Sequence, residues 1–442
     1  MLRGPKRLLT DFQPIEGPQV WRNWAGTVES KVEQIPRPLT EEQLGNAVLN
    51  APAPLRPVGS GHSFTPLVAT TGTILDLSAF SGLIDHNEAE CTATIGAGTK
   101  LCDLTRMLAG LGQALPNMGD IDQQSVAGAL ATATHGSGLT LGAYHTQLRA
   151  IHFVDGCGKK RVFEASRDQE MINATGVGLG IFGAVTAVTM QNVPSYNLRR
   201  KRTMLPITAT LDSFESLMSR HRSTEIFIVP FARHALVQML DKTDNLGDYS
   251  ATAEDEAGIA TLKTLRNYLK SFPTIRRMLI SHAMAKLSDE EHVGEWMKIY
   301  VTDRQSKFNE TEYHLPFEEG ALALTEIIKL IETRFRQIYF PIEVRTVKRD
   351  DFWLSPFYGR DTCSIAVHHG AGEDYSAFFR AAEAIFRRRG GRPHWGKLHT
   401  MTAADLAAVY PRFNDAMEVR REMDPEGRFV SPYLSKLLGI AL

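Results

Sequence analysis

Glycine is distributed unevenly along the chain. This uneven distribution limits the folds that the chain can adopt more than any other feature of the sequence does. Most of the 35 glycines lie before Pro194, where they separate short β-rich runs, such as 73–77 and 92–95, from helical patterns. Beyond Pro194 glycine is sparse, and an amphipathic helix is predicted over 318–336 among strand-like runs. The pattern predicts an α+β protein with one domain over 1–194, a second over 195–390, and a C-terminal segment, 391–442, that returns to the first.

Composition excludes several classes of protein. The 442 residues include 49 basic and 50 acidic ones, and a net charge of −1 gives no electrostatic reason to expect nucleic acid as a partner. No apolar run approaches the length of a membrane span, and the N-terminus lacks the apolar core of a signal peptide, so we predict a cytoplasmic protein. The four cysteines are scattered without a C-x-x-C pair, which indicates buried small side chains.

Two glycine motifs resemble nucleotide-binding loops but stand in the wrong context. Residues 178–183 spell G-x-G-x-x-G, a motif that in dinucleotide-binding domains opens a helix whose N-terminal amides bind the pyrophosphate. Here a β-branched run, 184–193, follows, so we reject a Rossmann domain and predict a tight turn before a buried strand. The run 96–100 has the wrong spacing for a P-loop and is predicted to be a strand-to-helix turn.

The loop 58–63, Val-Gly-Ser-Gly-His-Ser, is the strongest candidate for binding an anionic group. Successive backbone amides of glycine and serine can form an anion-binding nest. His62 is unusual within such a loop, although a lone histidine is more often a hydrogen-bonded structural residue than a reactive one. The loop alone therefore leaves the role of His62 open.

A second stretch, 125–138, consists almost entirely of glycine, alanine, serine and threonine around His135. Such small residues let a backbone approach a flat ligand closely, and the interleaved hydroxyl groups can bond its polar edge. A tightly packed glycine and alanine contact explains the same composition equally well.

Three charged residues of the second half could form a reaction site. Glu343 and Arg345 alternate on a predicted strand, so both side chains share one face. Arg345 could stabilise a developing alkoxide, Glu343 could fix hydroxyl groups or accept a proton, and Lys397 would add a positive charge. A structural ion-pair cluster is the alternative. The fourteen histidines show no H-E-x-x-H or comparable spacing, so no metal site is predicted.

Taken together, these segments resemble the FAD-binding fold of the vanillyl-alcohol oxidase family, in its branch of sugar-lactone and alditol oxidases. The likeness covers nearly the whole chain and is carried by four ordered motifs, at 58–64, 124–136, 340–345 and 392–397. Four motifs at family-like separations are more specific than any one alone. The resemblance implies a two-subdomain FAD-binding domain and an α+β substrate-binding cap domain.

The resemblance also implies residue roles. In this family the loop histidine is bonded to the flavin, which implies FAD held covalently through His62. The other implied cofactor-binding residues are Val58, Gly59, Ser60, Gly61, Ser63, Asp120, Ser125, Gly128, Thr132, Thr134, His135, Gly183, Ala184 and Val185. Catalytic roles are implied for Glu343, Arg345 and Lys397, which would form the substrate site together with His368 and His394. Gly370 departs from the pattern, because it stands where relatives carry a hydroxyl-bearing side chain.

The implied reaction is the oxidation of a CH–OH group of an aldono-1,4-lactone, with hydride transfer to the flavin N5 and reoxidation by O₂ or another acceptor. An alditol oxidase that acts on xylitol or sorbitol and releases H₂O₂ is the alternative. A flavin-binding protein without catalytic activity is a third possibility, against which the intact Glu343, Arg345 and Lys397 speak. The predicted partners are a small sugar-derived molecule and an electron acceptor.

Overall fold

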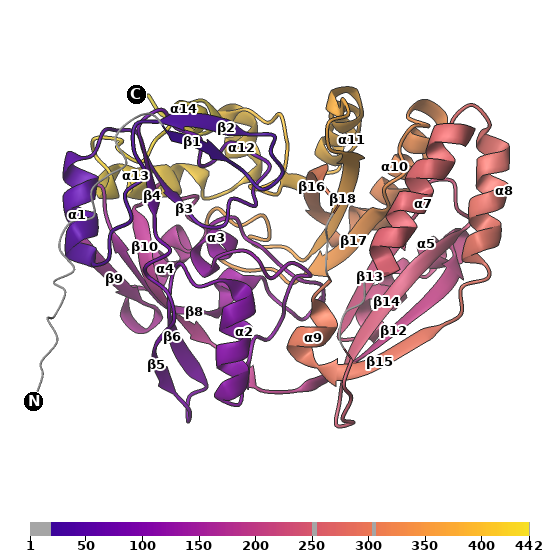
Figure 1. Ribbon diagram of the computed structural model, residues 1–442, viewed down its shortest axis with the longest axis horizontal. Coiled ribbons are helices and arrows are strands. Elements are labelled where there is room, and N and C mark those ends of the chain that lie inside the picture. Colours follow the sequence, from indigo (N-terminus) through magenta and orange to yellow (C-terminus); the bar gives the residue numbers. More distant parts are fainter. Residues whose placement is uncertain (1–18, 250–253, 303–305, 442) are drawn as a thin grey trace, which may run out of the picture.

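In the computed structural model, which describes residues 19–249, 254–302 and 306–441, the chain forms two lobes (Figure 1). The first lobe is built on an antiparallel five-stranded sheet with the order β5-β6-β10-β8-β9. Its strands are β5 (Leu83–Asn87), β6 (Thr92–Gly96), β8 (Leu148–Val154), β9 (Lys160–Glu164) and β10 (Ala184–Gln191). The strand predicted over 184–193 is thus confirmed as β10, and the glycines of 178–183 form the turn that precedes it.

Three helices accompany this sheet, α2 (Leu101–Gly110), α3 (Val126–Ala131) and α4 (Ala165–Thr175). α2 forms where leucines recur at helical spacing, and Leu101, Leu104 and Leu108 are buried. The helix ends just before Gly112, whose φ of +68° is a conformation that favours glycine. The run 96–100 connects β6 to α2, as predicted.

A second part of the first lobe combines the two ends of the described chain. It contains the hairpin β1 (Gln19–Arg22) and β2 (Glu29–Val32), helix α1 (Glu41–Asn50), the parallel pair β3 (Leu55–Val58) and β4 (Thr73–Asp76), and the C-terminal helices α12 (Ala403–Val409), α13 (Phe413–Met423) and α14 (Pro432–Leu438). The amide of Leu55 donates to the Arg428 carbonyl at 2.6 Å. The C-terminal helices lie beside the N-terminal elements, at the indigo and yellow ends of the colour scale (Figure 1).

The second lobe is built on an antiparallel eight-stranded sheet with the order β15-β12-β14-β13-β17-β18-β16-β19. Its strands are β12 (Asn197–Pro206), β13 (Ser223–Ile228), β14 (His234–Thr243), β15 (Glu290–Glu295), β16 (Phe308–Pro316), β17 (Ile342–Val347), β18 (Thr362–Gly370) and β19 (Arg392–Pro393). Its helices are α5 (Ile207–Asp212), α6 (Phe214–Arg220), α7 (Glu254–Leu269), α8 (Pro273–Met284), α9 (Trp296–Tyr300), α10 (Gly320–Arg334) and α11 (Ser376–Arg388).

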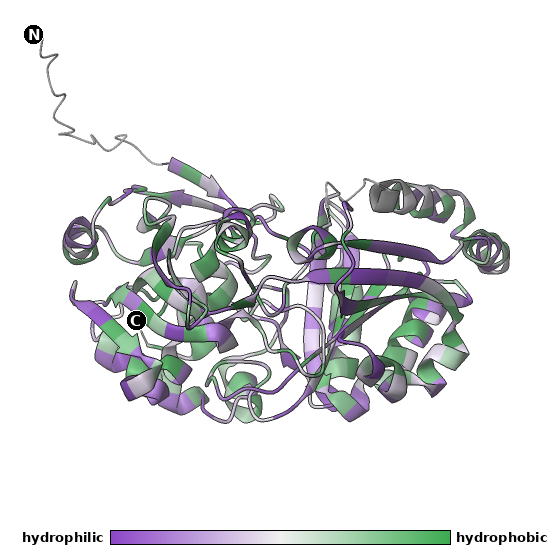
Figure 2. Cartoon of the chain, turned by 90° about the horizontal axis from the view of Figure 1, so that it is seen from below, coloured by the Kyte–Doolittle hydropathy of each residue, from purple (hydrophilic) through white to green (hydrophobic). Residues whose placement is uncertain are grey.

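Helices lie on both sides of this sheet (Figure 2). The helix predicted over 318–336 is α10, which follows a short 3₁₀ turn, Phe317–Glu319. β18 is buried along its whole length, as expected for a strand covered on both faces. Because β19 pairs with β16, the chain leaves the sheet of the second lobe only after Pro393. No helix in the described ranges is long and apolar enough to cross a membrane.

The glycine-rich stretch of the first lobe runs directly against the sheet of the second. The Gly138 amide donates to the Thr346 carbonyl at 2.7 Å, and the Ser137 hydroxyl donates to the Thr224 carbonyl at 2.6 Å. A Cβ atom on Gly138 would come within 2.6 Å of the Arg222 carbonyl oxygen, so this approach requires glycine. These contacts bring residues 134–138 next to β13, β17 and the charged side chains that the sheet carries.

Candidate active site

A pocket of the first lobe collects the loops that the sequence singled out. Its lining includes the whole run 56–63, the small-residue run with Gln124, Ser125, Ala127 and Gly128, and the turn 178–180 with Gly183. These segments are far apart in the sequence, and the sheet of the first lobe brings them around one hollow. Most of the wall is backbone, glycine or a short side chain.

Glycine shapes this pocket because the segments approach too closely for a side chain. A Cβ atom on Gly59 would lie 2.0 Å from the Ser125 hydroxyl oxygen. A Cβ atom on Gly183, which has φ +144°, would lie 2.4 Å from the Val154 carbonyl oxygen. Gly61 also has a positive φ, +67°. The pocket is therefore a property of backbone shape more than of any one side chain.

The residues predicted to bind the cofactor fall into two groups. Eleven line this pocket: Val58, Gly59, Ser60, Gly61, His62, Ser63, Ser125, Gly128, Thr132, Gly183 and Val185. The other four, Asp120, Thr134, His135 and Ala184, are not among its lining residues. Asp120 and His135 instead contact charged residues of the second lobe, at 3.1 Å and 3.0 Å.

Arg56 stands at the beginning of the pocket loop, and the sequence analysis did not single it out. Its guanidinium donates to four backbone carbonyl oxygens, those of Leu67, Leu179, Gly180 and Phe429. Burial lowers the pKa of Arg56 to about 9. This side chain therefore fastens the turn 178–180 and the C-terminal segment to the loop that carries His62. Its position two residues before the glycine motif gave no signal of such a role.

His62 lies where the pocket meets the second lobe. Its ring stacks on Trp24 with the ring centroids 5.4 Å apart. Burial, together with the positive charges of Lys397 and Lys100, lowers the pKa of His62 to about 4. The imidazole is therefore neutral at pH 7, and a ring nitrogen keeps its lone pair.

Lys397 reaches this position because the segment after β19 docks on the His62 loop. The Phe64 amide donates to the Gly396 carbonyl at 2.7 Å, and the Thr65 hydroxyl donates to the Trp395 carbonyl at 2.8 Å. The Lys397 ammonium forms an ion pair with Glu310 and lies 5.2 Å from the centre of the Phe64 ring. Glu310 in turn lies 3.7 Å from the Nε2 of His368.

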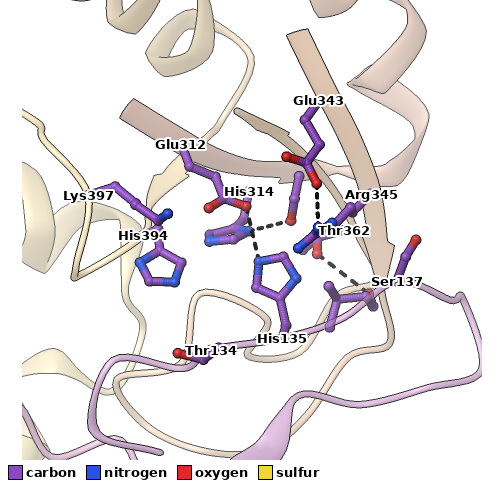
Figure 3. A network of polar contacts seen from close by, with 12 residues as sticks. Thr134, His135, Ser137, Glu312, His314, Glu343, Arg345, Thr362, His394 and Lys397 are labelled. Carbon is purple, nitrogen blue, oxygen red and sulfur yellow. Dashed lines mark hydrogen bonds and ion pairs between the residues drawn. The ribbon is translucent and has the colours of Figure 1, made fainter. Parts of the chain in front are cut away.

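Glu343 and Arg345 share one face of β17, as their spacing predicts, and form an ion pair (Figure 3). The Arg345 guanidinium also reaches Asp120 of the first lobe at 3.1 Å and Glu225 of β13 at 3.3 Å. Burial by itself would lower the pKa of Arg345, but the carboxylates of Glu343, Glu225 and Asp120 raise it well above its usual value. The Arg345 guanidinium therefore stays protonated among these carboxylates.

Below Lys397 lies a buried group of imidazoles around Glu312 (Figure 3). The Nδ1 of His135 is 2.8 Å from the Gly136 carbonyl oxygen, and its Nε2 is 3.0 Å from the Glu312 carboxylate. Both ring nitrogens of His135 therefore face oxygen atoms. Burial alone would raise the pKa of Glu312, but the contact with His135 holds it well below its usual value.

His314 and His394 complete this group and are neutral. Burial lowers the pKa of His314 well below its usual value and that of His394 to about 3. The Nδ1 of His394 accepts a hydrogen bond from the Gly396 amide at 3.0 Å, which requires its lone pair. His135, Glu312 and His314 offer ligand atoms within 4.8 Å of one another, a set that could hold a cation although no sequence spacing predicted it.

The sequence analysis missed the residues of β16 that complete the site, Glu310, Glu312 and His314. They alternate with Asn309, Thr311 and Tyr313, so all three project to one face of the strand. The strand is buried except at Pro316, yet most of its residues are polar. Charged residues at a period of two within a β-rich run were the available signal, because charges are almost never buried unless a site uses or pairs them.

Gly370 ends β18 on the same face as His368. A Cβ atom there would lie 3.0 Å from the Tyr339 hydroxyl oxygen and 3.4 Å from the Glu373 carboxylate. Tyr339 comes from the loop before β17 and is buried. The Tyr339 hydroxyl group thus lies beside Gly370, the position at which this chain lacks a hydroxyl-bearing side chain.

Comparison with known proteins identifies the families that this chain resembles. A family model described as D-arabinono-1,4-lactone oxidase matches residues 188–437, and one described as FAD binding domain matches 33–163. The L-gulono-1,4-lactone dehydrogenase of Mycobacterium tuberculosis is 34% identical over 95% of this chain and 99% of its own length. The alditol oxidase of a Streptomyces species is 29% identical over 94% and 98% of the two chains.

A solved structure confirms the predicted fold. Cholesterol oxidase from Brevibacterium sterolicum superposes with a TM-score of 0.79, at 17% sequence identity, over 98% of this chain and 99% of its own. At that identity the likeness bears on the fold alone. Together with the matched family models, it confirms an α+β chain with an FAD-binding part and a second part that the D-arabinono-1,4-lactone oxidase model covers.

The residues present fit FAD. The pocket is lined by three loops of backbone and small side chains, which a planar ring and a pyrophosphate can approach closely. The glycine cradle at Gly59 and Gly183 has no room for larger residues. The neutral His62 ring lines the same pocket, and the charge of Lys397 contributes to its lowered pKa.

Proposed function

The chain belongs to the D-arabinono-1,4-lactone oxidase family and is an FAD-dependent oxidoreductase that acts on CH–OH donors, and from that premise we propose that its substrate is an aldono-1,4-lactone. The observation that carries this proposal is the polar network that contains Arg345, Glu343 and Lys397 (Figure 3), where a small polyhydroxylated molecule could meet both charges and hydrogen-bond acceptors. The relatives named for gulono- and arabinono-lactones support the same substrate class.

We propose that the pocket residues hold FAD through the amides of 59–63 and the small residues of 125–132. Bound FAD supplies the acceptor for the hydride that leaves the substrate carbon. The second group of predicted residues, Asp120 and His135, would act at the substrate side, because they contact Arg345 and Glu312. Thr134 and Ala184 would support the fold of the loops.

We further propose that His62 carries the flavin covalently. Its lowered pKa keeps the ring uncharged at pH 7, so a nitrogen lone pair is available for bond formation. The predicted result is a yellow, fluorescent protein after acid denaturation. His62→Ala should release all of its FAD into the acid supernatant. An adduct that persists in this variant contradicts the assignment, and Trp24→Phe, which keeps His62, serves as the matched control.

In the proposed reaction the protein orients the C–H bond and handles the hydroxyl proton. The Arg345 guanidinium faces the developing alkoxide, and the three neighbouring carboxylates keep this guanidinium protonated. A Glu343 carboxylate oxygen accepts the hydroxyl proton, and Glu310 and Lys397 bond the neighbouring hydroxyl groups. Burial of this cluster strengthens each of these interactions relative to water.

An alditol is the second candidate substrate, favoured by the alditol oxidase among the relatives. Parallel turnover measurements on gulono-, galactono- and arabinono-1,4-lactone and on xylitol and sorbitol separate the two. Activity confined to the polyols contradicts the lactone proposal. Peroxide formation measured beside dye reduction identifies the electron acceptor.

A further inference from the structure

A small group of buried side chains connects the two lobes (Figure 3). His135 comes from the small-residue stretch of the first lobe, whereas Glu312 and His314 come from β16 of the second. All three side chains are buried. Each offers one nitrogen or oxygen atom, and these three atoms lie within 4.8 Å of one another. Three potential metal ligands from distant segments therefore meet at one place.

The separations within this group suit a small metal ion. Two ligand atoms of a tetrahedral zinc ion, each about 2.0–2.2 Å from the metal, lie about 3.4 Å apart. The Nε2 of His135 lies 3.0 Å from a carboxylate oxygen of Glu312. Small rotations of these two side chains are therefore enough for one ion to bind both atoms.

The Nδ1 atoms of both imidazoles have the partners that are usual for metal-bound histidines. The Nδ1 of His135 lies 2.8 Å from the Gly136 carbonyl oxygen, and that of His314 lies 2.5 Å from the Ser364 hydroxyl oxygen. Such contacts orient the ring and leave Nε2 for the metal. The Nε2 of His314 is buried and has no hydrogen-bond partner among the described residues. A buried polar atom without a partner is unfavourable, and a bound ion would satisfy it.

The charges of the surrounding network also favour a bound cation. The network contains only two cationic side chains, Arg345 and Lys397, among the described residues that form its ion pairs. It contains five carboxyl groups, those of Asp120, Glu225, Glu310, Glu312 and Glu343. Carboxylates that are buried near one another repel, and a divalent cation is the strongest local charge that can offset them.

We propose that His135, Glu312 and His314 bind a zinc ion. Two imidazoles and one carboxylate form a donor set of the zinc type, whereas Mg²⁺ and Ca²⁺ prefer oxygen ligands and would find a single carboxylate. His394 is not a ligand, because its Nδ1 accepts a hydrogen bond from the Gly396 amide and its Nε2 carries the proton.

The proposed ion ties the first lobe to the second. His135 and Glu312 are 177 residues apart in the sequence, so the ion joins the small-residue stretch directly to the sheet of the second lobe. Three protein ligands leave the fourth position of the zinc ion to a water molecule. Because the site forms only when the lobes are folded and docked, zinc binding stabilises the folded protein.

The test uses the full-length holoprotein, first treated with a chelator and then dialysed against ZnSO₄. We expect one zinc ion per chain by elemental analysis and a thermal midpoint that rises with the zinc concentration. MgCl₂ at the same concentrations should give neither result. Because neither measurement uses turnover, the outcome does not depend on which substrate the protein oxidises.

Two variants locate the bound ion. His314→Gln removes a ligand and should weaken zinc binding at least about 100-fold in equilibrium dialysis. Ser364→Ala removes only the hydroxyl group that orients His314 and should weaken zinc binding about tenfold, so it tests the site even if His314→Gln does not fold. The matched control is His86→Gln, at an exposed histidine of β5, which should bind zinc like the unchanged protein.

The proposal is overturned if the chelator-treated protein takes up no zinc. It is also overturned if His314→Gln and Ser364→Ala both bind zinc as tightly as the unchanged protein, because the ion would then be held elsewhere. Equal stabilisation by Mg²⁺ and Zn²⁺ would contradict the assigned donor set.

Discussion

The pocket of the first lobe and the charged site of the second lobe recognise their ligands by opposite means. The pocket is shaped by backbone that only glycine permits, as at Gly59 and Gly183. The charged site consists of long side chains from adjacent strands, in which Arg345 is surrounded by three carboxylates. We therefore expect an added methyl group to disturb ligand binding in the pocket, and a removed charge to disturb the reaction at the charged site.

The largest effect should come from Arg345→Met, which removes the charge that faces the developing alkoxide. We expect kcat/KM to fall about 10³-fold, equivalent to about 4 kcal/mol of transition-state stabilisation. The FAD content should stay unchanged, because Arg345 is not among the residues that line the pocket. Steady-state turnover and the flavin absorbance measure the two quantities separately.

Arg345→Lys is the conservative control. It keeps the charge but not the planar fork that reaches Asp120, Glu225 and Glu343, so only part of the activity should return. Turnover of Arg345→Met at the level of the unchanged enzyme would show that the pair with Glu343 is purely structural. The charged site would then not supply the transition-state stabilisation assigned to it.

A smaller effect is expected from Gly59→Ala in the pocket. The new Cβ atom would lie 2.0 Å from the Ser125 hydroxyl oxygen, and the strain of such overpacking, about 1–3 kcal/mol, should lower FAD occupancy about tenfold. The flavin-to-protein absorbance ratio measures this. Adding Ser125→Ala to Gly59→Ala removes the clashing oxygen and should restore part of the occupancy.

Gly110→Ala in α2 is the matched control for an added methyl group. No atom lies within 4 Å of its Cβ position, so FAD occupancy should not change. The protein should gain up to about 1 kcal/mol of stability, since alanine favours a helix more than glycine does. Equal loss of FAD in both glycine variants would mean that the pocket does not depend on close backbone approach.

The smallest effect expected, at most about 1.4 kcal/mol per pH unit, is on the pH dependence of stability. The unfolded chain binds a proton on His394 near its usual pKa of 6.5, whereas the folded pKa is about 3. Between these values the unfolded state holds more protons, so the free energy of unfolding falls as the pH falls from 6.5 towards 3. His394→Asn should reduce this slope by up to about 1.4 kcal/mol per pH unit.

Thermal or urea unfolding at several pH values measures the slope. The exposed residue His86 on β5 provides the control, and His86→Asn should leave the slope unchanged. An unaltered slope in His394→Asn would indicate that His394 is not buried in its neutral form. The imidazole group around Glu312 would then be more open to water than the charged site requires.

Much of the site could be predicted from sequence because its signals are local. The glycine loop 58–63 and the run 125–138 are unusual stretches whose composition limits what they can contact. Glu343 and Arg345 follow the period of a strand, and the strand is there. The roles of Glu310, Glu312 and Arg56 were missed, because they depend on which distant segments these side chains contact. Alternating charges along one strand do not indicate which residues will lie opposite them.

The sequence by itself determined the division into a glycine-rich first part and a second part with longer helices. It also determined the positions of the glycine turns and the face that Glu343 and Arg345 share. These features follow from backbone sterics and strand periodicity, which act over a few residues. Only the tertiary structure decided that Asp120 meets Arg345 and that Lys397 lies close to His62. These are pairings over hundreds of residues. They depend on how two sheets and the returning C-terminal segment pack, which no local pattern specifies.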